Sequence, residues 1–328
     1  MTFDEILSAA RSLSETGRQS LITALSTCNH CEAVVPESSR LLSLIEKRGH
    51  CPLCGSSRYY RFGKDKGTQR FRCRDCGRAF TEYTGTWQQQ LHKKGLVSAY
   101  MRLMAGQKSP DKISAALHIN KNTAFDRRHK ILRSPRQDEG SSFSGITESD
   151  GTFFDKSDKG CRHLRHKPRK RGGGDKGKGI SKRKATVIVT ADRKNDLNMT
   201  FCGYGRLTKA EISESLHTPL PQGTVLCSDG HVSYKGYAMD NHLEHVVIRG
   251  DLGQHVKRGV FHIQHVNSIH SRLKKWINST FWGVATKYMQ DYLNRFKVKE
   301  TVLKFCSDQA DELPGLSMRH YTVNFATV

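Results

Sequence analysis

Residues 146–154 read Ile-Thr-Glu-Ser-Asp-Gly-Thr-Phe-Phe, and here the sequence pattern changes from one typical of helices to one typical of strands. The opening of this run predicts a short strand that ends at Asp150, just before Gly151. Upstream, residues 134–145 are rich in serine, glycine and charged side chains, which is typical of a linker. We therefore expect a separate domain to begin near residue 136.

Further strand-like runs follow at 185–190 and 224–227, and helical spacing returns at 265–298. Strands that alternate with helices predict an α/β domain with a mixed sheet and flanking helices. We assign this domain to residues 136–300, and residues 301–328 form a C-terminal tail that carries no recognisable motif.

Two aspartates stand at the ends of predicted strands: Asp150, and Asp229 in the Ser-Asp-Gly sequence at 228–230. Carboxylates at neighbouring strand ends can hold divalent cations between them, as two-metal phosphoryl chemistry requires. An Asp before Gly at a strand end is also the ordinary composition of a turn. The pair alone does not decide between these two interpretations.

The helix predicted over 265–276 is amphipathic, and its polar face is rich in functional groups. Asn267, Ser271 and Lys274 follow one another at helical spacing, which places them on one face. Asn267 could join the aspartates at a site. Alternatively, it could be a helix N-cap or a buried amide bonded to the backbone.

Taken together, these motifs resemble the insertion-sequence transposases of the DDE superfamily. The resemblance rests on Asp-Gly-Thr-Phe-Phe at 150–154, the basic segment 167–173, Ser-Asp-Gly at 228–230 and His-Val-Asn-Ser-Ile-His-Ser-Arg-Leu-Lys at 265–274. It runs in order over roughly residues 50–298. The sequence is most similar to the group with an N-terminal zinc ribbon and an Asn in place of the final Glu.

The resemblance implies a ribonuclease-H-like catalytic core that binds Mg²⁺ or Mn²⁺. By position in the family's motifs, Asp150 and Asp229 are the two metal-binding acids and Asn267 is the third catalytic member. Lys274 matches the Lys that holds DNA near the scissile phosphate in several such families. The implied activity is metal-dependent hydrolysis and strand transfer.

The sequence departs from the family's pattern at two positions. Gly151 follows the first acid, where the family commonly has Glu, and Asn267 is neutral. Because Asn267 is neutral, a second metal ion would be held by fewer charges than in a full acidic triad. Neighbouring acids that could compensate are Glu148, Asp240 and Glu244.

Upstream of this domain, two Cys-x-x-Cys pairs, Cys51/Cys54 and Cys73/Cys76, are separated by 18 residues. Two such knuckles supply the four thiolates of a closed tetrahedral Zn²⁺ site. We therefore expect a zinc ribbon over 51–90, the alternative being two unrelated knuckles. Another pair, Cys28 and Cys31, has no obvious second half, and its metal binding stays open.

Between the knuckles, 59–62 and 69–72 are strand-like runs in which arginines alternate with aromatic residues. This combination suits contact with a phosphate backbone, and we select Arg70 and Arg72 as candidate DNA contacts.

Residues 91–135 predict a helix-turn-helix-like unit, with a turn at 118–120. In that arrangement Asn122, Thr123 and Arg127 of the second helix would face a major groove. The alternative is an ordinary helical hairpin with a solvated basic face.

A basic insert at 156–184 carries 13 lysines and arginines against two aspartates. Its centre is glycine-rich and too charged to fold against a core, so we expect an arm that orders on nucleic acid. The alternative is a merely solvated loop. The candidate phosphate contacts in this arm are Lys167, Arg169, Lys170 and Arg171.

The whole chain of 328 residues has a formal net charge of +23, which implies a polyanionic partner. No apolar stretch approaches the length of a membrane span, and the first residues lack the pattern of a secretory signal. Residues 1–50 predict an N-terminal helical segment. We therefore expect a cytoplasmic, nucleoid-associated protein.

These observations favour a DNA transposase that binds insertion-sequence ends and uses Zn²⁺ structurally and Mg²⁺ or Mn²⁺ catalytically. Its expected partner is double-stranded DNA, both element ends and target, and the resemblance implies a homodimer or larger assembly on it. The alternatives are a non-catalytic zinc-ribbon DNA-binding protein, such as a regulator or a domesticated transposase, and an RNA-directed nuclease with the same core.

Overall fold

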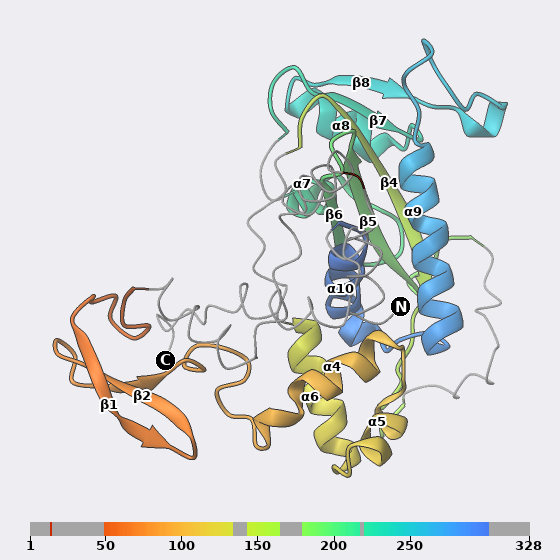
Figure 1. Cartoon of the computed structure of the whole chain (residues 1–328). Coiled ribbons are helices and arrows are strands. Elements are labelled where there is room, and N and C mark those ends of the chain that lie inside the picture. The colour runs from red at the N-terminus through yellow and green to blue at the C-terminus, as the bar shows by residue number, and fades with distance from the viewer. Residues whose placement is uncertain (1–13, 15–48, 134–142, 165–178, 217–219, 302–328) are drawn as a thin grey trace. The chain divides into compact units, whose positions relative to one another are not determined.

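The computed structural model describes residues 14, 49–133, 143–164, 179–216 and 220–301 (Figure 1). Within these residues the chain forms two compact units, and the first ends at Thr84 while the second begins at Gly85. Several expectations lie outside the described residues: the helices before residue 48, the Cys28/Cys31 pair, most of the linker, the centre of the basic insert and the C-terminal tail. In the described part of the chain no helix is long and apolar enough to cross a membrane.

The first unit is a three-stranded antiparallel sheet in the order β1-β2-β3. Its strands are β1 (Tyr59–Asp65), β2 (Thr68–Cys73) and β3 (Ala79–Thr81). The small core beneath them joins aromatic rings to cysteines, with Phe71 and Phe80 stacked at a centroid distance of 5.6 Å. A core this small supports a stable fold only with a cross-link such as a structural metal.

The second unit begins with three helices. They are α4 (Val97–Ala105), preceded by the 3₁₀ turn η1 (Lys94–Leu96), α5 (Pro110–Ala116) and α6 (Lys121–Arg133). The Ser109 side chain accepts a hydrogen bond from the Lys112 backbone N–H, and Pro110 occupies the first turn, so α5 begins where capping rules place it. Residues 117–120 separate α5 from α6.

A five-stranded mixed sheet follows, in the order β6-β5-β4-β7-β8. The strands are β4 (Ile146–Asp155), β5 (Lys184–Asp192), β6 (Leu197–Tyr204), β7 (Val225–Ser228) and β8 (Glu244–Val247). β4, β5 and β6 pair antiparallel, whereas β7 and β8 extend the sheet parallel to β4. The mixed α/β architecture expected from the sequence is confirmed.

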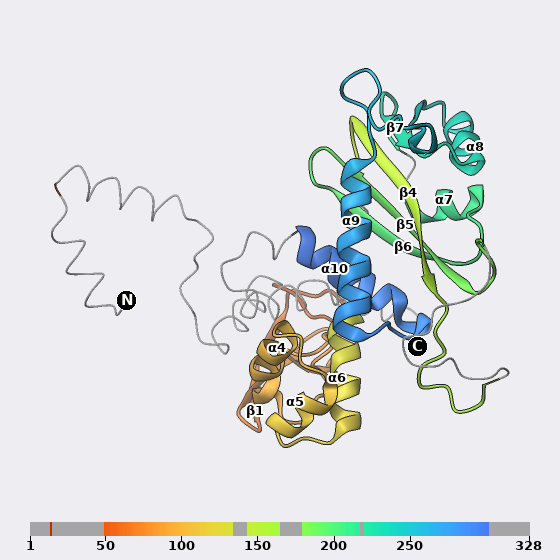
Figure 2. The same cartoon turned by 90° about the vertical axis from the view of Figure 1, so that its right-hand side faces the viewer.

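Helices cover both faces of this sheet, as Figure 2 shows. On one face lie α9 (Gln264–Lys275) and α10 (Met289–Thr301), which pack on Val187, Val189 and Met199. On the other lie α7 (Lys209–Leu216) and α8 (Val232–Asp240), which pack on Ile188 and Leu226. Short turns complete the unit: η3 (Gly250–Leu252), the π-helical η4 (Trp276–Thr280) and η5 (Thr286–Tyr288).

The expectation that a strand ends at Asp150 is wrong. β4 continues to Asp155, because β5 pairs with it from Thr147 to Asp155 without a break. Gly151 therefore lies within a strand and forms no turn. By contrast, Asp229 directly follows β7, as predicted.

Candidate active site

The two aspartates come from neighbouring parallel strands, Asp150 from β4 and Asp229 from the residue that follows β7. Glu148 of β4 is paired with Cys227 of β7, and each aspartate lies two residues further along its own segment. The turn after β7 is fixed by Gly230, whose φ is +86° and where a Cβ would lie 2.5 Å from a methyl group of Val247. The Asp229 carboxylate also accepts the backbone N–H of His231 at 3.0 Å, so the turn interpretation of Ser-Asp-Gly holds as well.

The chemical state of Asp150 reflects this neighbour. Burial and the negative charge of Asp229 raise the pKa of Asp150 to about 7, against the opposing effects of the Gly151 backbone N–H and Lys274. A buried carboxylate whose ionisation is disfavoured by a neighbouring carboxylate suits a divalent cation, because the cation removes the repulsion. Their oxygen donors are the type that Mg²⁺ and Mn²⁺ prefer.

Helix α9 supplies the groups that face Asp150. His270 places its Nδ1 atom 3.8 Å from an Asp150 carboxylate oxygen. Burial and the charge of Lys274 lower the pKa of His270 to about 4, so its imidazole is neutral at pH 7. Lys274, one turn further on, acts on both groups. Sequence reasoning missed His270, although its spacing from Asn267 and Lys274 places it on their helix face.

Asn267 is the fourth residue of α9 and is exposed. Neither alternative for it fits, because Ile263 occupies the N-cap position and the Asn267 side chain is not buried. Its helical spacing places it one turn before His270 and two turns before Lys274.

A second feature that sequence reasoning left unplaced is Glu148, which fixes the start of α9. This carboxylate is 1% exposed and accepts the backbone N–H groups of His265 and Val266 at 3.0 and 3.2 Å. It also meets Arg193 at 2.8 Å and the His265 imidazole at 2.8 Å. A carboxylate at a helix N-terminus satisfies free N–H groups and complements the helix dipole. Glu148 therefore joins β4 to α9 two residues from Asp150.

The other acids named as compensating charges lie elsewhere. Asp240 pairs with Lys209 at 2.6 Å, and Glu244 pairs with Arg258 at 3.4 Å.

The structure also shows what a larger side chain at Gly151 would contact. A Cβ at this position would meet Leu207, which belongs to the core on the α7/α8 side. A glutamate there would point away from Asp150, because successive residues of a strand face opposite sides.

Among the described residues, the groups of three or more potential ligands within 4.8 Å of one another are the four cysteines and Glu148 with His262 and His265. In the group of Glu148, His262 and His265, the Arg193 guanidinium already contacts Glu148 and His265 and supplies the positive charge that a metal ion would bring.

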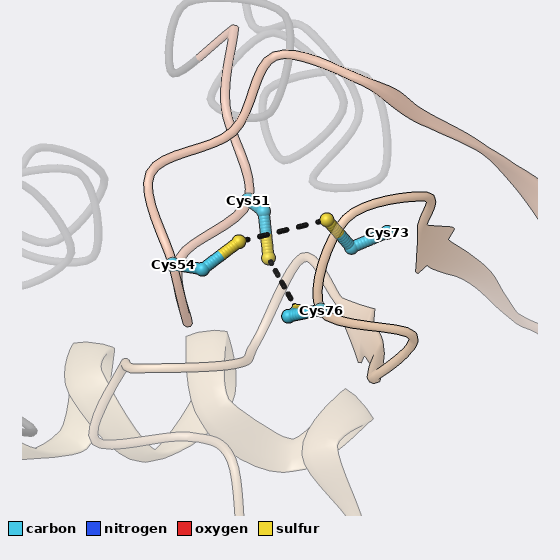
Figure 3. Close-up of side chains that lie close together, drawn as sticks. All are labelled: Cys51, Cys54, Cys73 and Cys76. Atoms are coloured by element: carbon cyan, nitrogen blue, oxygen red, sulfur yellow. Dashed lines mark hydrogen bonds between the residues drawn. The ribbon is translucent and has the colours of Figure 1, made fainter.

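The four cysteines of the first unit converge on one point (Figure 3). Sγ distances are 3.9 Å for Cys51–Cys76 and 3.6 Å for Cys54–Cys73. Tetrahedral geometry with Zn–S bonds of about 2.3 Å places the sulfur atoms about 3.8 Å apart. Gly55 and Gly77, each following a knuckle, have φ values of +77° and +69° that favour glycine. This donor set fits a structural zinc ion.

Arginines and aromatic rings share the outer surface of the same sheet. The guanidinium groups of Arg70 and Arg72 lie 5.3 and 5.2 Å from the centre of the Phe62 ring. Arg74 lies similarly over Tyr60. Both rings are exposed. Stacked in this way, the arginines keep their charge at the surface with less freedom to move.

The expectation that Arg127 faces a DNA major groove is wrong. This side chain is 2% exposed, lies over the Tyr100 ring and donates to the His92 carbonyl at 2.8 Å, so it cannot face a groove. Asn122 and Thr123, at the start of α6, are exposed as expected. Lys167, Arg169, Lys170 and Arg171 lie outside the described residues.

Comparison with known proteins adds to this geometry. Residues 142–301 match the family model of the ISXO2-like transposase domain. The chain is 27% identical over 279 residues to an uncharacterized protein in transposable element ISH50 of Halobacterium salinarum, covering 81% of this chain and 91% of that one. It is 34% identical over 91 residues to the insertion element iso-IS1N protein InsA of Shigella dysenteriae, covering 27% of this chain and 93% of that one.

Among solved structures, the pre-cleavage Mos1 transpososome matches with a TM-score of 0.24 and 10% identity, covering 70% of this chain and 79% of that one. The Mos1 mariner paired-end complex with Mn matches with a TM-score of 0.21 and 9% identity, covering 62% and 79%. Scores this low carry no argument about the fold. The sequence matches support a transposase: residues 142–301 are similar to the ISXO2-like transposase domain, and the chain is related to insertion-element proteins.

Proposed function

We propose that this chain is an active transposase whose mixed-sheet domain is a ribonuclease-H-like core. In this proposal it cleaves DNA at the ends of its element and joins the freed ends to target DNA. The observation that carries the proposal is that Asp150 of β4 and Asp229, which follows the neighbouring parallel strand β7, lie close enough for the charges of Asp229 and of Lys274 on α9 to act on Asp150. The match of the surrounding residues to a transposase domain supports it.

In the proposed reaction Asp150 and Asp229 hold Mg²⁺ or Mn²⁺ through their carboxylate oxygens. The bound metal supplies positive charge that favours ionisation of the attacking oxygen and stabilises the leaving one. Water attacks the phosphodiester at the element end and frees a 3′-hydroxyl, which then attacks a target phosphodiester. Both steps exchange one phosphorus–oxygen bond for another, so no covalent protein–DNA intermediate is required.

The groups on α9 have separate tasks in this proposal. Lys274 binds a phosphate beside the reacting one, and Asn267 offers a neutral amide to the metal or the DNA. His270 restrains the Asp150 carboxylate from behind, and Glu148 anchors the helix so that these groups keep their positions.

Recognition of DNA belongs to the N-terminal parts. With zinc bound by its four cysteines, the three-stranded unit presents Arg70 and Arg72 to the phosphate backbone. The exposed start of α6, with Asn122 and Thr123, would contact base edges. A homodimer or larger assembly on paired ends completes the proposal.

The experiment is a cleavage and strand-joining assay on DNA that carries the sequences flanking the gene, with Mg²⁺ or Mn²⁺. Asp229→Asn should lower cleavage at least about 100-fold and leave end binding intact. Asp251→Asn is the matched control, because Asp251 is exposed and pairs with Arg249. Specific binding by folded, zinc-loaded wild-type protein without any cleavage would refute the proposal in favour of a DNA-binding regulator.

A further inference from the structure

A small cavity in the second unit is lined by three basic side chains. Arg128 comes from α6, and Arg295 and Lys299 come from α10, with Gln107, Trp276 and Tyr292 among the other lining residues. The volume of the cavity is about 40 Å³. One water molecule needs about 10–15 Å³ on this scale, so the space corresponds to about three waters, close to a tetrahedral oxyanion.

Arg295 is a buried cation that forms no ion pair with the acidic side chains of the described residues. It is 8% exposed, and its Nη1 atom has no hydrogen-bond partner in the described part of the chain. Burial lowers the pKa of Arg295 to about 10, so the side chain stays charged at neutral pH. The two acids of α10 are engaged elsewhere, Asp291 with Arg133 and Glu300 with Arg272.

Arg128 is also buried, and it interacts with the hydroxyl groups of Tyr100 and Tyr292. It is 3% exposed and donates one Nη group to the Lys108 carbonyl, and its guanidinium lies 5.9 Å from the centre of the Phe281 ring. Its Nε atom is buried without a partner among the described residues. Two guanidinium groups with unused donors therefore line one small space.

None of the residues that line the cavity is an aspartate or a glutamate. Burying a charge without a partner is costly, and buried arginines are normally found with an anion or a full set of acceptors. The planar guanidinium fork matches the oxygens of a phosphate group better than it matches a halide. Charge, size and donor geometry thus agree on one class of ligand.

We propose that this cavity binds a phosphate-type oxyanion, held by Arg128 and Arg295, with the more exposed Lys299 adding charge. The group can be free inorganic phosphate or a phosphate of a DNA backbone. The site uses none of the residues assigned to cleavage, so it does not rest on the proposed function. Its occupation would join α6 of the DNA-binding unit to α10 of the mixed-sheet domain.

The first arm of the test uses inorganic phosphate on the full-length, zinc-loaded protein at constant ionic strength, with chloride as the reference anion. Binding is followed by ³¹P line width and by the unfolding midpoint. We expect saturable binding that Arg295→Gln weakens at least 10-fold and Lys299→Gln at least 3-fold. Arg258→Gln, at an exposed arginine that pairs with Glu244, should bind phosphate as the wild type does.

The partly exposed Lys299 keeps the test decisive if Arg295→Gln fails to fold. Phosphate binding of equal strength in the wild type and in Lys299→Gln and Arg295→Gln, as far as each folds, would overturn this site, because the phosphate would then bind elsewhere on a basic surface.

The second arm adds a short DNA duplex. If DNA supplies the phosphate, the duplex displaces inorganic phosphate, and Arg295→Gln or Lys299→Gln lowers the salt dependence of DNA binding by about one unit of slope. If free phosphate is the ligand, it stays bound beside DNA. The proposal fails if phosphate shows no saturable binding and neither variant changes the affinity for DNA or its salt dependence.

Discussion

The anchoring of α9 by Glu148 can be tested by Glu148→Gln, which keeps the size of the side chain and removes its charge. The wild-type carboxylate is 1% exposed and accepts hydrogen bonds from two backbone N–H groups. It also forms an ion pair with Arg193 at 2.8 Å. The amide keeps one acceptor oxygen and turns an NH₂ group toward donors. Breaking a buried pair costs about 3–5 kcal/mol, and the lower end applies because Arg193 can reach water. We therefore expect a loss of about 3 kcal/mol.

For a unit of this size, 1 kcal/mol shifts the unfolding midpoint by about 2–4 °C, so the expected fall is about 6–12 °C. The measurement is denaturant and thermal unfolding of the zinc-loaded chain. The matched control is Glu244→Gln, because the Glu244 side chain is 55% exposed and pairs with Arg258. An exposed pair of this kind contributes at most about 1 kcal/mol. Equal stability of the two variants would refute the anchoring role.

Three further predictions follow from the same structure. Because the pKa of Asp150 is raised to about 7, the folded metal-free protein holds this proton more tightly than the unfolded chain, and it should lose stability as the pH rises from about 4 through 7. Asp150→Asn should remove this loss, which can be checked by measuring the thermal unfolding midpoints of the wild type and the variant between pH 5 and 8.5. If the midpoints of the two proteins change with pH in parallel, the prediction is wrong. Cys73→Ser should remove one equivalent of zinc and make residues 49–84 susceptible to protease, because this unit depends on the metal for its fold. The control Cys161→Ser should keep the zinc content of the wild type, and elemental analysis measures the zinc in both variants. Replacing Arg70 and Arg72 together by Gln should lower the salt slope of DNA binding by about two units, and an unchanged slope would remove them from the interface.

Local patterns in the sequence were enough to predict the elements with short-range signals. The cysteine spacing predicted a cluster that the structure brings together, and Asp229 follows a strand as expected. The helices α4 to α6 were also predicted, because helical spacing is a local signal.

What the sequence could not give depends on partners far along the chain. Asp150 lies within a strand because β5 pairs with β4 beyond it. Arg127 is buried because one face of α6 packs inside the unit, and no local pattern tells which face that is. The role of Glu148 arises only when α9 returns to β4 more than a hundred residues later. The sequence analysis did not single out β6 or β8, although Leu197, Met199 and Phe201 of β6 alternate with polar residues.

The central claim is that Asp150 and Asp229 form one divalent-cation centre. Titration of the zinc-loaded protein with Mn²⁺, followed by electron paramagnetic resonance, tests it directly. The account predicts a Mn²⁺ site in the wild type and in Asp251→Asn that is lost or weakened at least about 10-fold in both Asp150→Asn and Asp229→Asn. Mn²⁺ binding by Asp229→Asn with the affinity of the wild type would contradict it.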